Sequence, residues 1–171
     1  RSGMVLAEGV PDSLDVSHVH EAAPSAFPNG THVAEVEIDP DTGIVEVVKY
    51  TMVSDFGTVI NPLLVEGQSH GGVVQGIGQA LFEHVVYSEE GQPLTGSFTD
   101  YALPRAADTP FFRMDYHSVP AKTNVLGAKG CGEAGCAGSL PSVMNAIVDA
   151  LGGRHINMPA TPERVWEALN S

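Results

Sequence analysis

The amino-acid sequence predicts an α+β fold, a mixed sheet with packed helices, on the strength of three observations. Its 171 residues, 43% of them apolar and 17% charged, are enough for one globular domain with a hydrophobic core. Stretches of alternating or β-branched residues predict strands, and apolar residues at three- and four-residue steps predict helices. These strands and helices do not alternate regularly as βαβ units, which favours α+β over a parallel α/β sheet.

The N-terminal region differs in composition from the rest of the chain. Residues 1–29 show little periodicity, contain several glycines and prolines, and end at the turn signal Asn29-Gly30. We therefore expect residues 1–29 to be a connecting or peripheral segment and residues 30–171 to form the domain. Because the chain starts at Arg1 without an initiator methionine, we also expect it to be a piece of a longer polypeptide.

The first predicted supersecondary element is a hairpin. Residues 31–38 alternate imperfectly as a half-buried strand, and residues 44–53 are rich in valine and tyrosine. Between them, Asp39-Pro40-Asp41-Thr42-Gly43 has the composition of a tight turn. The same five residues lack the further acidic ligands of a calcium-binding loop. We therefore interpret them as a turn only.

A long helix is expected to follow the hairpin, over residues 62–83. Asn61 is suited to the N-cap and Pro62 to the first turn. Apolar residues recur at helical spacing: Val73, Val74, Ile77, Ala80 and Leu81. Five glycines interrupt this helix, each costing up to about 1 kcal/mol relative to alanine. Packing or binding must compensate for them.

The second half of the chain predicts a short hairpin, a strand and two helices. Residues 88–92 resemble a hairpin turn, residues 111–119 a strand, and residues 127–138 a glycine-rich segment. Residues 141–151 read as a helix with one apolar face that ends at Gly152-Gly153. A final short helix over residues 162–169 is expected to be capped by Thr161.

Charge and composition exclude several classes of function. The net charge of -13, from 21 acidic and 8 basic residues, disfavours nucleic-acid binding. No apolar stretch approaches the roughly 20 residues that cross a bilayer, so we expect no membrane insertion. The two cysteines, Cys131 and Cys136, make no disulfide framework and suit a reducing, cytoplasmic setting as small buried side chains. The histidines His18, His20 and His70 lack partners at the spacing of a metal site.

Two glycine-rich patches, residues 67–78 and 127–135, could carry chemistry. Neither is a phosphate-binding loop, because no Gly-Lys-Ser/Thr closes either patch. Gln68 in the first patch has an amide that can both donate to and accept from a heterocycle, although its spacing alone favours an exposed helix residue. Glu133 in the second is flanked by Gly132 and Ala134 and is a candidate general base. Taken alone, a carboxylate there is more often solvated or capping the next helix.

Four segments in this order resemble the xanthine oxidase family. They are the two patches, Val36-Glu37-Ile38-Asp39-Pro40-Asp41-Thr42-Gly43, and Asp55-Phe56-Gly57-Thr58-Val59-Ile60-Asn61-Pro62. The resemblance covers residues 27–151 and is to the C-terminal portion of the molybdopterin-binding large subunit, as in aldehyde oxidases and aerobic carbon monoxide dehydrogenases. It implies that Glu133, in Lys129-Gly130-Cys131-Gly132-Glu133, is the catalytic base beside molybdenum. It also implies that the Gly67-Gln68 pair contacts the pterin, with Gly132 in the second cofactor-binding segment.

The resemblance also implies a cofactor, partners and a reaction. The cofactor is molybdenum-molybdopterin in its cytosine dinucleotide form, and the partners are the rest of the large subunit and iron–sulfur and FAD subunits or domains. The reaction is the hydroxylation of an aldehyde, N-heterocycle or related small molecule. Glu133 must be ionised for this, and Lys129 is a candidate compensating cation.

Two alternatives stay open on the sequence. One is a non-catalytic binding or assembly domain that kept the fold, and the other is a small acidic enzyme that uses Glu133 without a metal. If the chain is instead the C-terminal portion of a molybdopterin-binding large subunit, as the resemblance implies, the isolated chain supplies only part of a cofactor site. We therefore expect it to fold but to be inactive, free of molybdenum and self-associated through apolar surface, as elemental analysis and light scattering can test.

Overall fold

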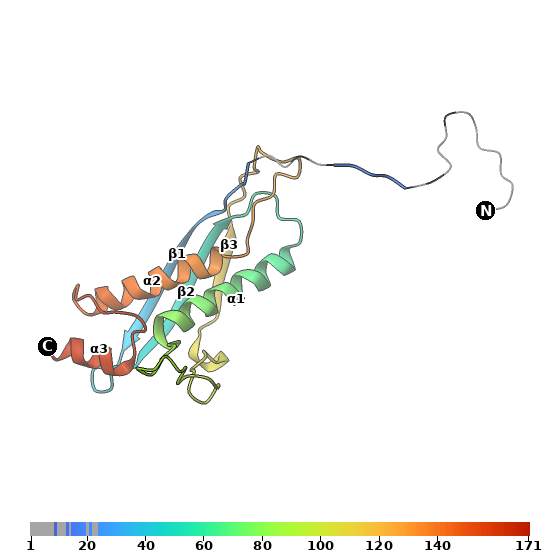
Figure 1. Cartoon of the computed structure of the whole chain (residues 1–171). Helices are drawn as coiled ribbons and strands as arrows, with labels where there is room; N and C mark the ends of the chain where they lie inside the picture. The colour runs from blue at the N-terminus through green and yellow to red at the C-terminus, as the bar shows by residue number, and fades with distance from the viewer. Residues whose placement is uncertain (1–8, 10–12, 14, 20, 22–23) are drawn as a thin grey trace.

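The computed structural model describes residues 9, 13, 15–19, 21 and 24–171, and it has the α+β architecture that the sequence predicts. The elements follow in the order β1 (Asn29–Ile38), β2 (Val45–Asp55), α1 (Pro62–Leu81), a 3-10 turn (Ala106–Asp108), β3 (Phe112–Tyr116), α2 (Ala134–Ala150) and α3 (Pro162–Leu169). Helices α1 and α2 lie side by side over one face of the sheet, and α3 lies near the C-terminus beyond them (Figure 1). The predicted division of the chain at residue 30 stays a prediction.

The sheet is mixed and has the strand order β1-β2-β3. β1 and β2 form the predicted antiparallel hairpin, and β2 pairs with β3 in parallel. The hairpin turn is closed by its own side chains, because the Asp39 carboxylate accepts from the Asp41 amide at 2.9 Å and from the Thr42 hydroxyl at 2.8 Å. Gly43 adopts a φ of 73° and lies against α3, where a Cβ would collide with Pro162 and Trp166. The interpretation of this segment as a turn is confirmed.

Small residues allow α1 and α2 to approach each other closely. Gly72 and Gly76 of α1 face Gly135 and Ser139 of α2. A Cβ on Gly135 would lie 2.7 Å from the carbonyl oxygen of Ser69, and a Cβ on Gly76 would overlap the Ser139 hydroxyl. The packing of this helix pair is the compensation for the low helix propensity of these glycines.

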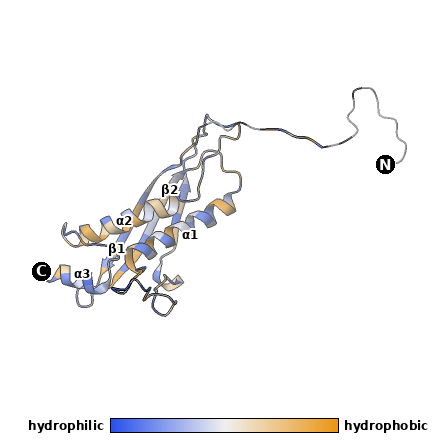
Figure 2. Ribbon diagram, in the orientation of Figure 1, coloured by the Kyte–Doolittle hydropathy of each residue, from blue (hydrophilic) through white to orange (hydrophobic). Residues whose placement is uncertain are grey.

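The hydrophobic core fills the space between the two helices and the sheet. Its largest fully buried members come from β2, the segment after it and the three helices: Tyr50, Met52, Phe56, Val73, Ile77, Val143, Ile147 and Val165. The apolar residues of α1 and α2 alternate with polar ones along the ribbon, as expected of helices with one buried face (Figure 2). Within the described residues, no helix is both long and apolar enough to span a bilayer.

The predicted start of α2 at residue 141 is wrong, since the helix begins seven residues earlier, at Ala134. Pro141 lies inside the helix, where it lacks the N–H that would bond to the Ala137 carbonyl. Ala137 is exposed, so water can satisfy that carbonyl. The predicted hairpin at residues 88–92 is present only as a turn with a single bridge between Tyr87 and Pro93. Pro93 has no N–H with which to extend a ladder.

Candidate functional site

The two glycine-rich patches meet through one hydrogen bond. The Gln68 Nε2 of α1 donates to the carbonyl oxygen of Gly132 at 2.8 Å, across 64 residues of sequence. Gly67 and Gly132 are exposed, and a Cβ built on either would meet nothing within 4 Å. Gln68, Gly67, Gly132 and the adjacent Glu133 are therefore brought together on an open surface. These are the site residues that the sequence predicts.

Glu133 occupies the N-cap position of α2 but does not cap it. Its backbone carbonyl accepts from the Ala137 amide at 2.9 Å, whereas its side chain makes no capping hydrogen bond. The residue is exposed. The first backbone N–H groups of α2 are therefore not capped by the side chain of Glu133. This arrangement leaves the carboxylate accessible to a ligand.

Lys129, four residues before Glu133, is directed elsewhere. Its Nζ lies 2.5 Å from Asp55 Oδ2, and both side chains are nearly buried, with 11% and 13% exposed. The Lys129 hydrogen bond, followed by those from the amides of Val119 and Gly57, lowers the pKa of Asp55 to about 2. Lys129 therefore neutralises Asp55, and the idea that it compensates the charge of Glu133 finds no support in this geometry.

The depressed pKa of Asp55 predicts a pH-dependent contribution to stability. A carboxylate whose pKa is lower in the folded state stabilises that state above its unfolded pKa, near 3.8, and loses this effect as the pH falls through about 2. We expect Asp55→Asn to lower the urea midpoint at pH 7, with the difference from the unsubstituted chain shrinking between pH 4 and pH 2. Urea titrations across this range, followed by circular dichroism, test this. A constant difference at every pH would contradict it.

Three buried hydroxyls near this end of the sheet have no hydrogen-bond partner among the described residues: Ser54, Ser69 and Tyr116. Ser54 and Tyr116 are paired in the parallel register near the ends of β2 and β3, and Ser69 directly follows Gln68. Burial, and then the charges of Glu66 and Cys131, raises the pKa of Tyr116. Unused hydroxyls, together with glycines that leave space, fit a large polar ligand at this end.

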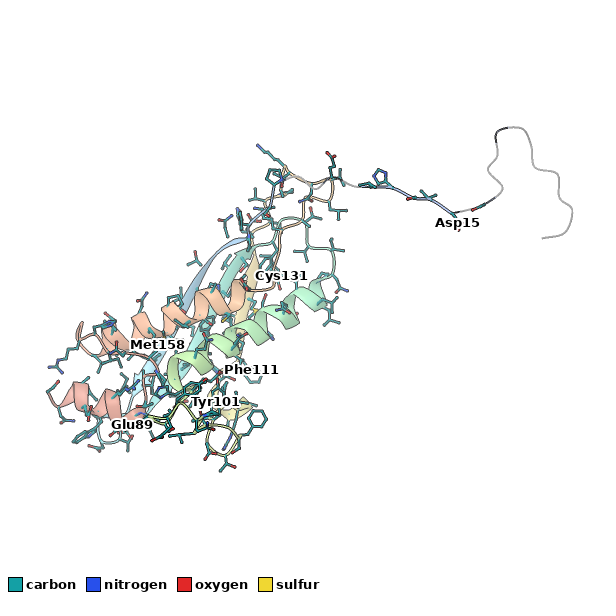
Figure 3. All side chains as sticks on the ribbon, viewed as in Figure 1. Asp15, Glu89, Tyr101, Phe111, Cys131 and Met158 are labelled. Atoms are coloured by element: carbon teal, nitrogen blue, oxygen red, sulfur yellow. The ribbon has the colours of Figure 1, made fainter. Side chains whose placement is uncertain are left out.

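The remaining polar candidates within the described part of the chain are not grouped as a metal site. Cys131 and Cys136 are free thiols and only half-buried, less than the sequence predicts, and burial is the main cause of the raised pKa of Cys136. Figure 3 shows Cys131 beside the N-terminal end of α2. Among the residues whose placement is described, no three histidine, cysteine or acidic side chains are grouped to hold a metal. His20 lies outside the described residues.

Two cavities, of about 480 and 260 Å³, lie along the seam between β1 and α2, and Gln68 and Glu133 line neither of them. Both are lined by His32, whose Nδ1 lies 2.6 Å from the Tyr50 hydroxyl. Burial lowers the pKa of His32 and raises that of Tyr50 to about 12, so a neutral imidazole and a neutral phenol share this hydrogen bond. We interpret the His32–Tyr50 pair as part of the packing between the sheet and α2.

Comparisons with known proteins show the family of this chain. Residues 7–110 match the family model described as a molybdopterin cofactor-binding domain. The nicotine 6-hydroxylase large subunit of Paenarthrobacter nicotinovorans is 41% identical over 163 residues, which cover 94% of this chain and 20% of that protein. The carbon monoxide dehydrogenase large chain of Hydrogenophaga pseudoflava is 35% identical over 164 residues, with the same two shares.

Solved structures show the same relationship. Quinoline 2-oxidoreductase from Pseudomonas putida 86 superposes with a TM-score of 0.80 at 37% identity, covering 84% of this chain and 19% of that one. The chain thus spans about a fifth of the length of the relatives it matches. On these matches it belongs to the family of molybdopterin cofactor-binding domains found in the large subunits of molybdenum-dependent oxidoreductases.

Proposed function

We propose that the chain is the C-terminal part of the large subunit of a molybdenum hydroxylase, with Glu133 as the base. The substrate class is an aldehyde, an N-heterocycle or a related small molecule. The observation that carries the proposal is the hydrogen bond from Gln68 to Gly132, which joins the two patches and places Glu133 at their junction. The large subunits of nicotine 6-hydroxylase and carbon monoxide dehydrogenase, to which the chain is similar, support an oxidoreductase.

Gln68, Gly67 and Gly132 are the residues that would hold the cofactor on this chain. The Gln68 amide supplies polar contacts, and the two glycines leave the backbone open to a bulky ligand. When bound, molybdenum-molybdopterin supplies the two-electron redox chemistry, and we propose its cytosine dinucleotide form. The hydroxyls of Ser54, Ser69 and Tyr116, which lack partners among the described residues, are buried beneath this end and leave its interior polar.

Glu133 is suited to moving a proton. An exposed carboxylate that makes no capping hydrogen bond can accept the proton of an attacking hydroxyl without first breaking an internal contact. Because Lys129 is paired with Asp55, its ammonium group does not form an ion pair with the Glu133 carboxylate. The carboxylate oxygens of Glu133 are therefore available to accept a proton from a bound reactant.

The surface around the start of α1 indicates where the rest of the protein would pack. Large apolar side chains are exposed there and in the segment before Gly127: Ile60, Leu63, Leu64, Val125 and Leu126. Exposed apolar patches mark interaction surfaces. We propose that the preceding part of the large subunit covers them, with iron–sulfur and FAD subunits or domains completing the electron path.

Replacement of Gln68 by alanine in the complete subunit tests the assignment of the cofactor site. Losing one or two hydrogen bonds to a ligand weakens binding by about 1 to 3 kcal/mol, or roughly 5- to 150-fold. We expect a clear fall in molybdenum per polypeptide with little change in the thermal unfolding of the apo form. Gln75→Ala, at an exposed position of the same helix, is the matched control and should load normally. Full molybdenum content in Gln68→Ala would count against the proposal.

A further inference from the structure

The segment that leads to Glu133 is bound along its first part to the end of β2. The amides of Thr58 and Ala121 both donate to the Gly127 carbonyl at 2.9 Å, and the Lys129 amide donates to the Phe56 carbonyl at 2.9 Å. Gly57 is bridged to Ala128 in the same region. Residues 127–129 are thus paired with residues 56–58 through backbone hydrogen bonds.

Asp55 joins three segments at this point. Its Oδ2 accepts from Lys129 Nζ, and its Oδ1 accepts from the amides of Gly57 and Val119, each at 2.9 Å. The carboxylate therefore connects β2, the chain after β3 and the segment before α2. Asparagine at this position keeps one oxygen that can accept from the amides of Gly57 and Val119, but it sets an NH2 group against Lys129 and leaves that ammonium without its carboxylate partner.

The other ion pair on the sheet differs in its exposure to solvent. Lys49 and Glu35 lie 2.6 Å apart across β1 and β2, but their side chains are 50% and 53% exposed. Exposed pairs are screened by solvent and contribute little, whereas nearly buried pairs hold their geometry. The Asp55–Lys129 pair is therefore the one able to fix a loop, and Lys49–Glu35 is a natural control.

Three residues separate Lys129 from Glu133, and two of them, Gly130 and Gly132, are glycines with open space around them. Glycine imposes little backbone restriction, so this stretch does not place Glu133 by itself. Its position depends on anchors on both sides. These are the Lys129 contacts before it, the Gln68 bond at Gly132 and the first turn of α2 after it.

We propose that Asp55 is a positioning residue, which fixes residues 127–133 by holding Lys129 and keeps the Lys129 ammonium away from Glu133. The effect on catalysis rests on the function proposed above, whereas the effect on the segment does not. A released Lys129 is free to pair with Glu133, four residues further along the chain, and a paired carboxylate is a weaker base.

Hydrogen exchange of the 171-residue chain tests the structural half without any cofactor. In Asp55→Asn and Lys129→Met we expect the hydrogen-bonded amides of residues 127–129 to exchange about tenfold faster, a clearly larger change than in residues 143–150 of α2, which report the loss of global stability. Glu35→Gln and Lys49→Met should leave both segments unchanged. Equal exchange in residues 127–129 of the Asp55 and Glu35 variants would overturn the proposal. Equal acceleration of residues 127–129 and 143–150 would also overturn it, because that result indicates general destabilisation alone.

Kinetics of the complete, cofactor-loaded subunit test the catalytic half. We expect Asp55→Asn to lower kcat by roughly 10- to 100-fold with KM and molybdenum content near normal, because a misplaced base loses rate and leaves binding intact. Lys129→Arg, which keeps the cation, should retain more activity than Lys129→Met. A kcat equal to that of Glu35→Gln would overturn the positioning role. If the unsubstituted subunit does not hydroxylate at all, the function proposal fails while the exchange result still decides the role of Asp55 in the loop.

Discussion

Replacing Glu133 by glutamine is expected to leave the cofactor in the complete subunit and to reduce turnover by about a hundred- to ten-thousandfold. Glutamine keeps the shape of the side chain, but its amide cannot accept the proton that a base must take. The side chain makes no capping hydrogen bond in α2, so the substitution removes basicity without breaking the helix start. The measurements are kcat in the presence of excess substrate and molybdenum per polypeptide.

Glu163→Gln provides the control for this experiment. Glu163 is also an exposed glutamate at the beginning of a helix, in the first turn of α3, and the substitution changes the net charge equally. It should retain normal turnover. A fully loaded Glu133→Gln enzyme with normal rates would show that the base lies elsewhere and would favour a domain that binds without catalysing.

Replacing Gly135 by valine is expected to produce the largest loss of stability. Its Cβ position lies within 3.0 Å of backbone atoms of Ser69, Gly72 and Val73, and backbone cannot rotate away as a side chain can. The two helices must separate, and overpacking of this kind costs about 1 to 3 kcal/mol. Urea unfolding of the 171-residue chain, monitored by circular dichroism, gives the free energy of unfolding.

Gly71→Ala is the matched control for the helix pair. Gly71 lies in α1 next to Gly72 but faces open space, so its substitution adds helix propensity without a collision. We expect this variant to be as stable as the unsubstituted chain or more stable by up to about 1 kcal/mol. If both variants unfold at the same urea concentration, close packing of α1 on α2 does not depend on the glycines.

The sequence predicts the start of a helix well where one capping side chain determines it. Asn61 and Thr161 were expected to be caps, and their side chains accept from the amides of Leu64 and Arg164. The start of α2 was missed because Pro141 suits a first turn and the glycines before it suit a loop. Residues 134–140 pack against α1 and, through Gly138, against His32 of β1, and these contacts are not local.

The candidate site was predicted by resemblance more than by local chemistry. Spacing alone favoured an exposed helix residue at Gln68 and a solvated or capping carboxylate at Glu133. Both are indeed exposed, and they are brought together by contacts distant in sequence, namely the packing of α1 on α2 and the bond across 64 residues. The role of Asp55 and the pairing of Ser54 with Tyr116 follow from the parallel register of β2 and β3, which no local pattern specifies. An aspartate as the last residue of a valine-rich strand is the signal that the sequence offers for Asp55.

The bond between Gln68 and Gly132 also decides which way round the glutamine amide faces. A carbonyl oxygen can only accept, so the nitrogen of the amide must be turned towards Gly132 and the oxygen away from it. A ligand that approaches the oxygen of the amide therefore meets an acceptor, which pairs with an N–H or O–H, and the second hydrogen of the nitrogen stays free to donate. Glutamate at this position would set a carboxylate oxygen against the Gly132 carbonyl, and both groups can only accept. An amide thus joins the two patches where an acid would push them apart.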